Sequence, residues 1–144
     1  MLTPASPAHA EALAAIHAAS FPTPAQWGPE AMALQLGLPG AFGWIDPSGG
    51  MILARVAADE AEILTLAVAP EARRKGVARA LLARARTQAA SAGATTIVLE
   101  VGARNTAAQT LYTSTGFTAV GRRPRYYPGG EDAVIMRAPL AASE

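Results

Sequence analysis

The stretch from Glu62 to Ala90 decides the fold of this chain, because it passes from a strand-like run through a basic turn into a helix-like run. It reads EILTLAVAPEARRKGVARALLARARTQAA. The apolar residues at 62–68 are typical of a strand, which Ala69-Pro70 ends. Apolar side chains then recur every four positions, at Val77, Leu81, Ala85 and Ala89. This spacing predicts a helix over 77–90, with Gly93 as its C-terminal stop.

The basic turn between these two elements, RRKGVA at 73–78, lies where a chain can bind a phosphate. The first N–H groups of a helix have no partners within the helix, and its N-terminus carries roughly half an elementary positive charge, so an anion is stabilised there. Gly76 has no Cβ to hinder a close approach, and Ala78 keeps the next contact small. The Walker sequence and the G-x-G-x-x-G of dinucleotide folds are both missing. We therefore expect a pyrophosphate ligand of another class.

The remaining chain predicts an α/β fold around a mixed central sheet with helices on both faces. Turn residues separate runs of helical and strand periodicity. These runs predict helices over 7–19 and from Pro29 on, a hairpin that pairs 41–45 with 51–57, a strand over 95–101, a helix capped by Asn105, and strands over 117–121 and 133–137. A strand, a crossover helix and a further strand place Gly76 at a carboxyl end of the sheet, where α/β folds bind ligands.

Length and composition indicate one compact enzyme. A chain of 144 residues should bury roughly 68–70% of its unfolded surface, so residues 1–144 are expected to form a single domain. The formal net charge of +1 argues against nucleic-acid binding. Cysteine is absent and the two histidines have no third ligand nearby in the sequence, so we expect no metal site. Neither a signal peptide nor an apolar run long enough for a membrane is found, so we expect a soluble cytoplasmic protein.

Three blocks of the sequence match the motifs of a known family. Arg73, Gly76 and Ala78 fit the pattern Arg/Gln-x-x-Gly-x-Gly/Ala, and the other blocks are LEVGARNTAAQTLYTSTGF at 99–117 and RRPRYYPGGEDAVIM at 122–136. With these motifs the chain resembles the GCN5-related N-acetyltransferase (GNAT) superfamily, and within it the RimI-type enzymes. The resemblance implies the GNAT fold, with acetyl-CoA as co-substrate and its pyrophosphate on the basic loop. It also implies a protein N-terminus as acceptor, since RimI-type enzymes acetylate the N-terminal amine of a ribosomal protein.

Two residues are candidates for the acid–base chemistry. Glu100 lies near the end of an apolar strand, in phase with Thr96 and Val98, so its carboxylate should emerge beside the opening of the sheet. An arbitrary Glu at this position is more often a solvated charge. The resemblance, however, implies that Glu100 is the base that takes the proton of the amine through water. Tyr112 alone would be a core aromatic. Its phenol, with a pKa near ~10, keeps its proton at neutral pH, and the resemblance implies that it acts as the acid for the departing thiolate.

The resemblance also implies how acetyl-CoA is held. Asn105 can cap its helix through the side-chain oxygen and also reach the pantetheine arm. A splayed sheet would leave the backbone groups of Leu66, Ala67 and Val68 free to pair with that arm. Three cations and the backbone N–H groups after them are expected to bind the phosphates, although isolated surface charges are usually only solvated. They are Arg73, Arg74 and Lys75, followed by Gly76, Val77 and Ala78.

Four aromatic residues are candidates for the acceptor side. Phe21 and Trp27 lie in the loop that overhangs the acceptor in the superfamily, although FPTPAQW here is longer than the compact F-P-W of RimI-type chains. Tyr126 and Tyr127 precede a Pro-Gly-Gly turn, and either line the peptide groove or stabilise a hairpin. Just past the turn, the carboxylates of Glu131 and Asp132 are expected to attract basic residues of the acceptor.

Three functions stay open at this point. The first is acetylation of a protein N-terminus, the second is acetylation of a small amine or a lysine, and the third is a non-catalytic acyl-CoA-binding module. Glu100 and Tyr112 in their expected places argue against the third. The segment 20–45 contains Glu30 as its only acidic residue, with Asp46 just beyond it, so no strongly acidic pocket is expected there. Glu100 is the one evident carboxylate base, which suits an α-amine of pKa about 7.7–8.0 better than a lysine of pKa about 10.4.

Overall fold

A seven-stranded sheet forms the centre of the protein. The computed structural model describes residues 1–21 and 26–141. The strands stand in the order β1-β2-β3-β4-β5-β7-β6. They are β1 (Thr3–Pro4), β2 (Ala41–Asp46), β3 (Gly50–Ala57), β4 (Glu60–Val68), β5 (Thr96–Gly102), β6 (Thr118–Arg123) and β7 (Ala133–Pro139). Neighbouring strands are antiparallel except β4 and β5, which are parallel, so the sheet is mixed as predicted.

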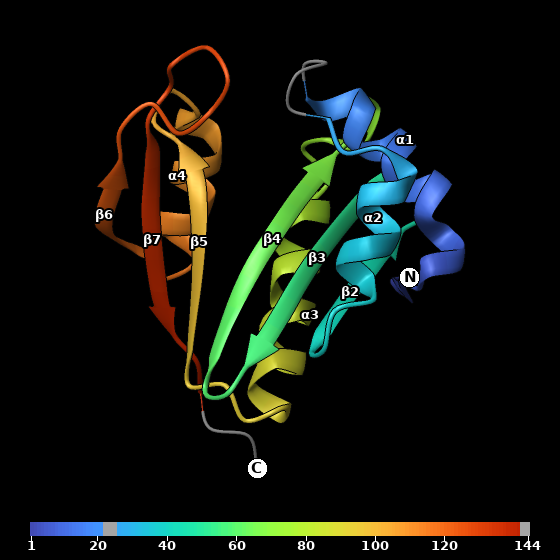
Figure 1. Cartoon of the computed structure of the whole chain (residues 1–144), viewed down its shortest axis with the longest axis horizontal. Helices are drawn as coiled ribbons and strands as arrows, with labels where there is room; N and C mark the ends of the chain where they lie inside the picture. The colour runs from blue at the N-terminus through green and yellow to red at the C-terminus, as the bar shows by residue number, and fades with distance from the viewer. Residues whose placement is uncertain (22–25, 142–144) are drawn as a thin grey trace.

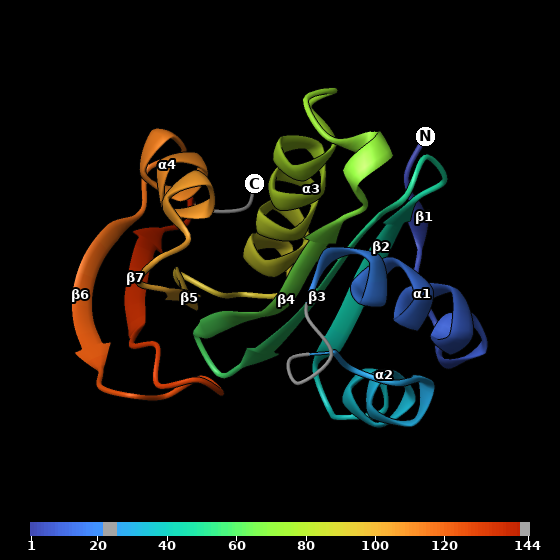
Figure 2. The ribbon, with the colours of Figure 1, turned by 90° about the horizontal axis from the view of Figure 1, so that it is seen from above.

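Helices cover both faces of this sheet, which confirms the predicted fold class. They are α1 (Ala10–Ser20), α2 (Pro29–Leu36), α3 (Val77–Ser91) and α4 (Thr106–Ser114), with short 3-10 turns at Pro7–His9 and Pro70–Ala72. The helices α3 and α4 lie on one face, and α1 and α2 lie on the other (Figures 1 and 2). Each face has its own hydrophobic core. No helix in the described part of the chain is long and apolar enough to cross a bilayer.

The helix α3, which belongs to the stretch that decides the fold, lies close to its predicted position. All four residues of the four-residue repeat in α3 are buried: Val77, Leu81, Ala85 and Ala89. The helix ends one residue beyond the prediction, at Ser91, and Gly93 follows with a φ of 98°. The Asn105 cap is also confirmed, because its Oδ1 accepts a hydrogen bond from the N–H of Ala108 at 3.1 Å. The short strand β1, which pairs with the end of β2, was not predicted.

A bulge interrupts β4 next to the candidate site. Leu53 of β3 pairs with Thr65 and Ala54 pairs with Ile63, so Leu64 is an extra residue in β4. An inserted residue reverses which side chains face each side of a sheet. Before the bulge, Ile63 packs into the core under α3, whereas after it Ala67 packs into the core under α1. One strand therefore contributes to both cores.

The strands β4 and β5 are paired only where they begin. Their register runs from Glu60 opposite Thr96 to Glu62 opposite Val98, and ends there. Beyond that point the two strands diverge toward their carboxyl ends, with α3 behind them (Figure 1). Within the described residues, the edge of β4 that faces β5 has no strand partner after Glu62. The structure thus contains the splayed sheet that the resemblance implied, opening at the end where the basic loop begins.

Candidate active site

The edge of β4 forms one wall of the opening in the sheet. Leu66 and Val68 direct their side chains into the core under α3, and Ala67 packs into the core under α1. What these three residues present to the opening is therefore backbone N–H and C=O, which no other strand uses within the described ranges. An extended amide-containing ligand can pair with such an edge as an added strand does. The pantetheine arm of acetyl-CoA has this character.

The basic loop that follows β4 has the backbone form of an anion site. Arg74 has a φ of 65° and Gly76 has a φ of 75°, both in the left-handed region. A residue other than glycine in that region costs of order 1–3 kcal/mol, and such residues cluster at ligand clamps. Residues 73–76 are all exposed, and no side chain of the described chain caps the start of α3. The first N–H groups of α3 are thus left for an anion.

Two residues of the loop use their side chains for contacts within the chain. The Nε of Arg73 donates a hydrogen bond to the carbonyl oxygen of Val68 at 3.0 Å, so this side chain turns back onto β4. This hydrogen bond holds the loop against the end of β4, and Arg73 also contributes a positive charge. The side chain of Val77 is buried in the core, which leaves only its backbone N–H for a phosphate. Arg74 and Lys75 are the exposed cations closest to the start of α3.

Gly76→Ala is expected to weaken acetyl-CoA binding at least about tenfold. The added methyl group would stand where the phosphates approach the N–H groups, and losing a hydrogen bond to a charged group costs about 1.5–3 kcal/mol. Gly93→Ala is the matched control at the other end of α3, since both glycines have a positive φ and open space around an added Cβ. Titration calorimetry should show weaker binding for Gly76→Ala alone. Equal affinities in the two variants would contradict the assignment of this loop.

Glu100 stands on the opposite wall, on β5. Its neighbours Leu99 and Val101 point into the core under α3, so its carboxylate lies on the other face of the sheet. The Oε2 atom is buried and accepts no hydrogen bond from the described residues. The Nε of Arg123, on β6, lies 2.7 Å from this oxygen, but the geometry is that of an ion pair and not of an aligned hydrogen bond. A buried carboxylate with one oxygen that accepts no hydrogen bond from the described residues is suited to accept a proton.

One phenol, that of Tyr127, interacts with this carboxylate, and a second, that of Tyr112, interacts with Tyr127. Tyr112 is only 7% exposed, and its ring packs edge-to-face against Phe117 with the centroids 5.5 Å apart. Burial and the neighbouring Tyr127 raise the pKa of Tyr112 to about 12. Burial also raises the pKa of Tyr127 to about 12, and the charge of Glu100 contributes to this shift. The structure thus brings Glu100, Tyr112 and Tyr127 into one neighbourhood, in which both phenols keep their protons at neutral pH.

Glu62 is a residue of this neighbourhood that the sequence analysis missed. It lies before the bulge, between the core-facing Ala61 and Ile63, so its carboxylate is on the same face of the sheet as that of Glu100. Burial raises the pKa of Glu62, and the charges of Glu100 and Glu60 raise it further. Glu100 is therefore not the only carboxylate of this neighbourhood among the described residues. The alternation of Glu60 and Glu62 was visible in the sequence, but their phase relative to Glu100 depends on the register of two strands.

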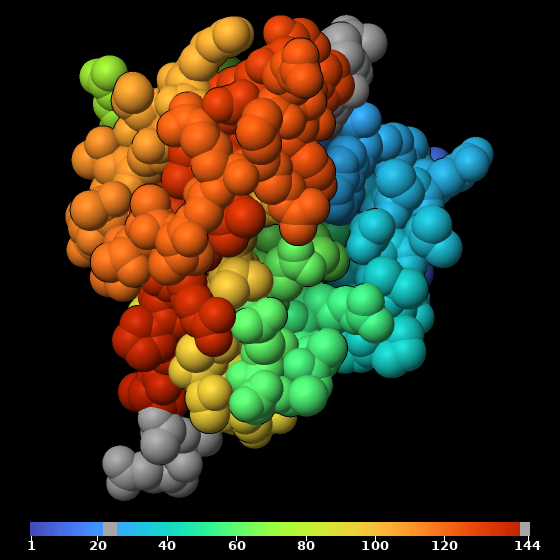
Figure 3. Space-filling view, turned by 60° about the vertical axis from the view of Figure 1, so that its left-hand side comes forward, coloured from blue at the N-terminus to red at the C-terminus, as the bar shows by residue number. Residues whose placement is uncertain are grey.

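The acceptor aromatics come from two segments on the two sides of the opening. In Figure 1 the end of α1 and the β6–β7 connection stand on opposite sides of it, and in Figure 3 their side chains approach each other above the β3–β4 hairpin. The rings of Tyr126 and Tyr127 meet edge-on with their centroids 5.1 Å apart, and Tyr126 is 49% exposed. Phe21 and Trp27 both stack on His17, a residue that the sequence analysis considered only as a metal ligand. Residues 22–25, also part of the predicted acceptor loop, lie outside the described ranges.

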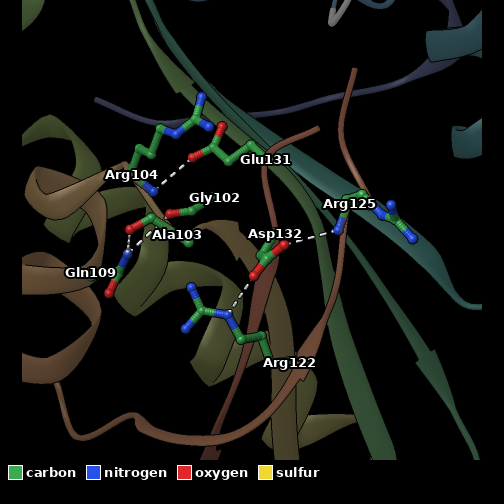
Figure 4. A network of polar contacts seen from close by, with 8 residues as sticks. All are labelled: Gly102, Ala103, Arg104, Gln109, Arg122, Arg125, Glu131 and Asp132. Atoms are coloured by element: carbon green, nitrogen blue, oxygen red, sulfur yellow. Dashed lines mark hydrogen bonds and ion pairs between the residues drawn. The ribbon is translucent and has the colours of Figure 1, made fainter. Parts of the chain in front are cut away.

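The two carboxylates past the hairpin turn are engaged within the chain (Figure 4). Glu131 accepts a hydrogen bond from the backbone N–H of Arg104 at 2.7 Å. Asp132 accepts from the Nε of Arg122 at 2.8 Å and from the N–H of Arg125 at 2.9 Å, and these contacts hold the pKa of Asp132 below its usual value. The Glu131 contact holds the β6–β7 connection against the loop between β5 and α4, and the Asp132 contacts lie within β6 and the connection. The attraction of basic acceptor residues by these carboxylates stays a prediction.

Comparison with known proteins agrees with this site. Residues 10–117 match the sequence model described as the Acetyltransferase (GNAT) family. The ribosomal protein bS18-alanine N-acetyltransferase of Escherichia coli is 41% identical over 92 residues, which cover 62% of this chain and 62% of that relative. This match therefore spans less than two thirds of the relative's length. The N-alpha-acetyltransferase RimI of Mycobacterium tuberculosis is 35% identical over 139 residues, which cover 90% of this chain and 86% of that one.

A solved structure extends the likeness over the whole chain. The crystal structure of the ribosomal-protein-S18-alanine N-acetyltransferase from Escherichia coli superposes with a TM-score of 0.85 at 31% identity. The superposition covers 100% of this chain and 97% of the other. The arrangement of sheet and helices in this chain is thus an architecture that is already known.

Proposed function

Because this chain belongs to the GNAT acetyltransferase family, we propose that it transfers the acetyl group of acetyl-CoA to the N-terminal α-amine of a protein. One observation supports this proposal most. The opening in the sheet has a free backbone edge on β4, which suits the acyl donor, and on β5 a buried carboxylate oxygen of Glu100 that accepts no hydrogen bond from the described residues. A donor thioester on one wall and a base on the other would place an amine between them.

The chemistry assigns one proton transfer to Glu100. The amine nitrogen attacks the thioester carbonyl carbon, the new C–N bond forms, and the C–S bond breaks as the thiolate leaves. Glu100 removes the proton that the nitrogen must lose, directly or through water. The second carboxylate, Glu62, lies on the same face and favours the approach of a cationic ammonium group. Burial and the charges of Glu100 and Glu60 raise the pKa of Glu62.

Tyr112 is suited to stabilise the leaving sulfur by a hydrogen bond. A thiol has a pKa of about 8.5, as in cysteine, whereas the pKa of Tyr112 is about 12. Complete proton transfer from this phenol to the thiolate would be uphill by about 5 kcal/mol, at about 1.36 kcal/mol per pKa unit. A hydrogen bond that strengthens as charge develops on sulfur does not have this cost. We therefore assign Tyr112 as a donor to the thiolate, with the proton of the thiol coming finally from solvent.

The acceptor is proposed to be an N-terminal residue of a ribosomal protein, and the enzyme would then work in the cytoplasm. Of the two relatives described above, one is named an N-alpha-acetyltransferase and the other an N-acetyltransferase for alanine of ribosomal protein bS18. An α-amine also loses its proton more easily than a lysine. The difference in pKa between about 7.7–8.0 and about 10.4 makes the neutral α-amine about 3.3 kcal/mol less costly at pH 7.

A second acceptor class is favoured by one feature of the structure. The carboxylates of Glu60, Glu62 and Glu100 are close enough for the first and the last to raise the pKa of Glu62. Such a group of negative charges attracts a small polycation as well as a peptide N-terminus. A polyamine is therefore the alternative acceptor, and the substrate comparison below includes one.

The wild-type enzyme is expected to prefer an Ala-Arg-started peptide over two competitors. One competitor is the same peptide with a blocked N-terminus and an internal Lys, and the other is spermidine. Product formation from acetyl-CoA, measured by mass spectrometry at pH 7 and equal acceptor concentrations, should be at least about tenfold higher for the free α-amine. A preference for the blocked peptide would establish a lysine acceptor, and a preference for spermidine would establish the polyamine alternative.

A further inference from the structure

His17 joins three parts of the acceptor side that are far apart in the sequence. The residue lies on α1, and its side chain is almost completely buried, at 2% exposure. The backbone N–H of Trp27 donates a hydrogen bond to its Nδ1 at 3.1 Å, and its Nε2 lies 3.0 Å from the hydroxyl oxygen of Thr65 on β4. The rings of Phe21 and Trp27 both stack on the imidazole, with centroids at 4.3 Å and 5.5 Å.

These contacts determine the protonation state of the ring. Since a backbone N–H can only donate, Nδ1 must accept and carries no proton. The proton of the neutral imidazole is then on Nε2, which donates to the hydroxyl oxygen of Thr65. Burial lowers the pKa of His17 to about 4, so this neutral form is the one present at neutral pH. Both nitrogens have a partner, which leaves neither of them for proton transfer to a substrate.

The contact on β4 lies at the bulge, beside the proposed donor site. Thr65 directly follows the extra residue Leu64. It directly precedes Leu66, the first of the three β4 residues whose backbone is proposed to pair with the pantetheine arm. His17 therefore fixes Phe21 and Trp27 relative to the strand that is proposed to hold the thioester. The distance between the acceptor aromatics and the reacting carbonyl depends on this connection.

We propose that His17 is a positioning residue that holds Phe21 and Trp27 against β4 and thereby sets the binding site of the acceptor. The inference rests on the proposed function, because it concerns the same acceptor amine. Acetyl-CoA is proposed to bind along the β4 edge and the basic loop, and no contact of His17 reaches the basic loop in the described chain. Loss of the connection should then affect the acceptor and leave the donor unchanged.

Steady-state kinetics of paired variants tests this inference. His17→Asn keeps an acceptor near the Nδ1 position but loses the bond to Thr65, and Thr65→Val loses the same bond from the other side. Both are expected to raise KM for the Ala-Arg peptide about tenfold, the effect of one buried polar group left without its partner. KM for acetyl-CoA should stay within about twofold, as for a group that makes no contact with the ligand. Thr65→Ser retains the hydroxyl and should restore the wild-type KM for the peptide.

His9→Asn is the matched control, because the Nδ1 of His9 also accepts a backbone N–H, that of Ser6 at 3.0 Å, and no hydrogen bond joins His9 to β4 in the described chain. It should leave both KM values unchanged. A lower free energy of unfolding with an unchanged peptide KM in His17→Asn and Thr65→Val would overturn the inference, as would equal increases of both KM values. If the wild-type enzyme acetylates no α-amine, the proposed function fails by itself. Hydrogen exchange then decides the inference, since Thr65→Val should accelerate exchange of the Trp27 amide and an unchanged rate would overturn it.

Discussion

Glu100→Gln is expected to lower kcat by about 10²- to 10⁴-fold at pH 7, the usual contribution of a general base. The amide has nearly the shape of the carboxylate but cannot take a proton from the attacking nitrogen. Above about pH 8 the α-amine loses its proton without help, so part of the activity should return as the pH rises. A pH–rate profile from pH 6 to 10, with saturating acetyl-CoA, measures both the loss and the recovery.

Glu60→Gln is the matched control for this variant. Glu60 lies on β4, forms an exposed ion pair with Arg137 at 3.7 Å, and stands two residues from Glu62. Removing its charge should change kcat by less than about twofold, since exposed ion pairs contribute little. If the profile of Glu100→Gln has the same shape as that of the wild type, or if Glu60→Gln loses as much activity, Glu100 is not the base.

Tyr112→Phe is expected to lower kcat by about 10²-fold or more at every pH from 6 to 10. The phenol keeps its proton over this range because burial raises its pKa to about 12. The ring, and with it the edge-to-face contact with Phe117, is retained in the variant. The affinity for acetyl-CoA should therefore change little, and the loss should appear in kcat.

Acyl donors with different leaving thiols distinguish a hydrogen bond to sulfur from a general structural defect. If Tyr112 stabilises the departing thiolate, its removal should matter most for a thiol of high pKa and least for an activated thioester that leaves easily. The ratio of wild-type to variant kcat should fall as the thiol pKa falls. A ratio independent of the leaving group would show that the hydroxyl does not act on the sulfur.

Much of the fold could be predicted from the sequence because its signals are local. The repeat of Val77, Leu81, Ala85 and Ala89 specifies one face of a helix, and that face is buried in the structure. The Asn105 cap and the Pro29 helix start are likewise decided within a few residues. Glu100 could be placed on the side of β5 away from the core by alternation within one strand.

The contacts that complete the candidate site could not be predicted, because each joins distant segments. His17 and Thr65 are 48 residues apart, and Arg123 reaches Glu100 from a strand that follows α4. The bulge at Leu64 is hidden for another reason. Residues 61, 63, 65 and 67 are all buried in regular alternation, although the first two and the last belong to cores on opposite faces. The alternation of apolar residues in a sequence indicates which side chains are buried, but it does not indicate which face of the sheet each buried side chain lies on.

The extra residue Leu64 changes which face of the sheet the side chains on either side of it point to. In a regular strand, residues 62 and 65 would point to opposite sides, because their separation is odd. With the insertion, the carboxylate of Glu62 and the hydroxyl of Thr65 are on the same side of the sheet, where Glu62 interacts with Glu100 and Thr65 contacts His17. Pairing Leu64 regularly with β3 would leave both residues in the chain and would still separate them across the sheet. The register of this segment is therefore as much a determinant of the candidate site as the identity of its side chains.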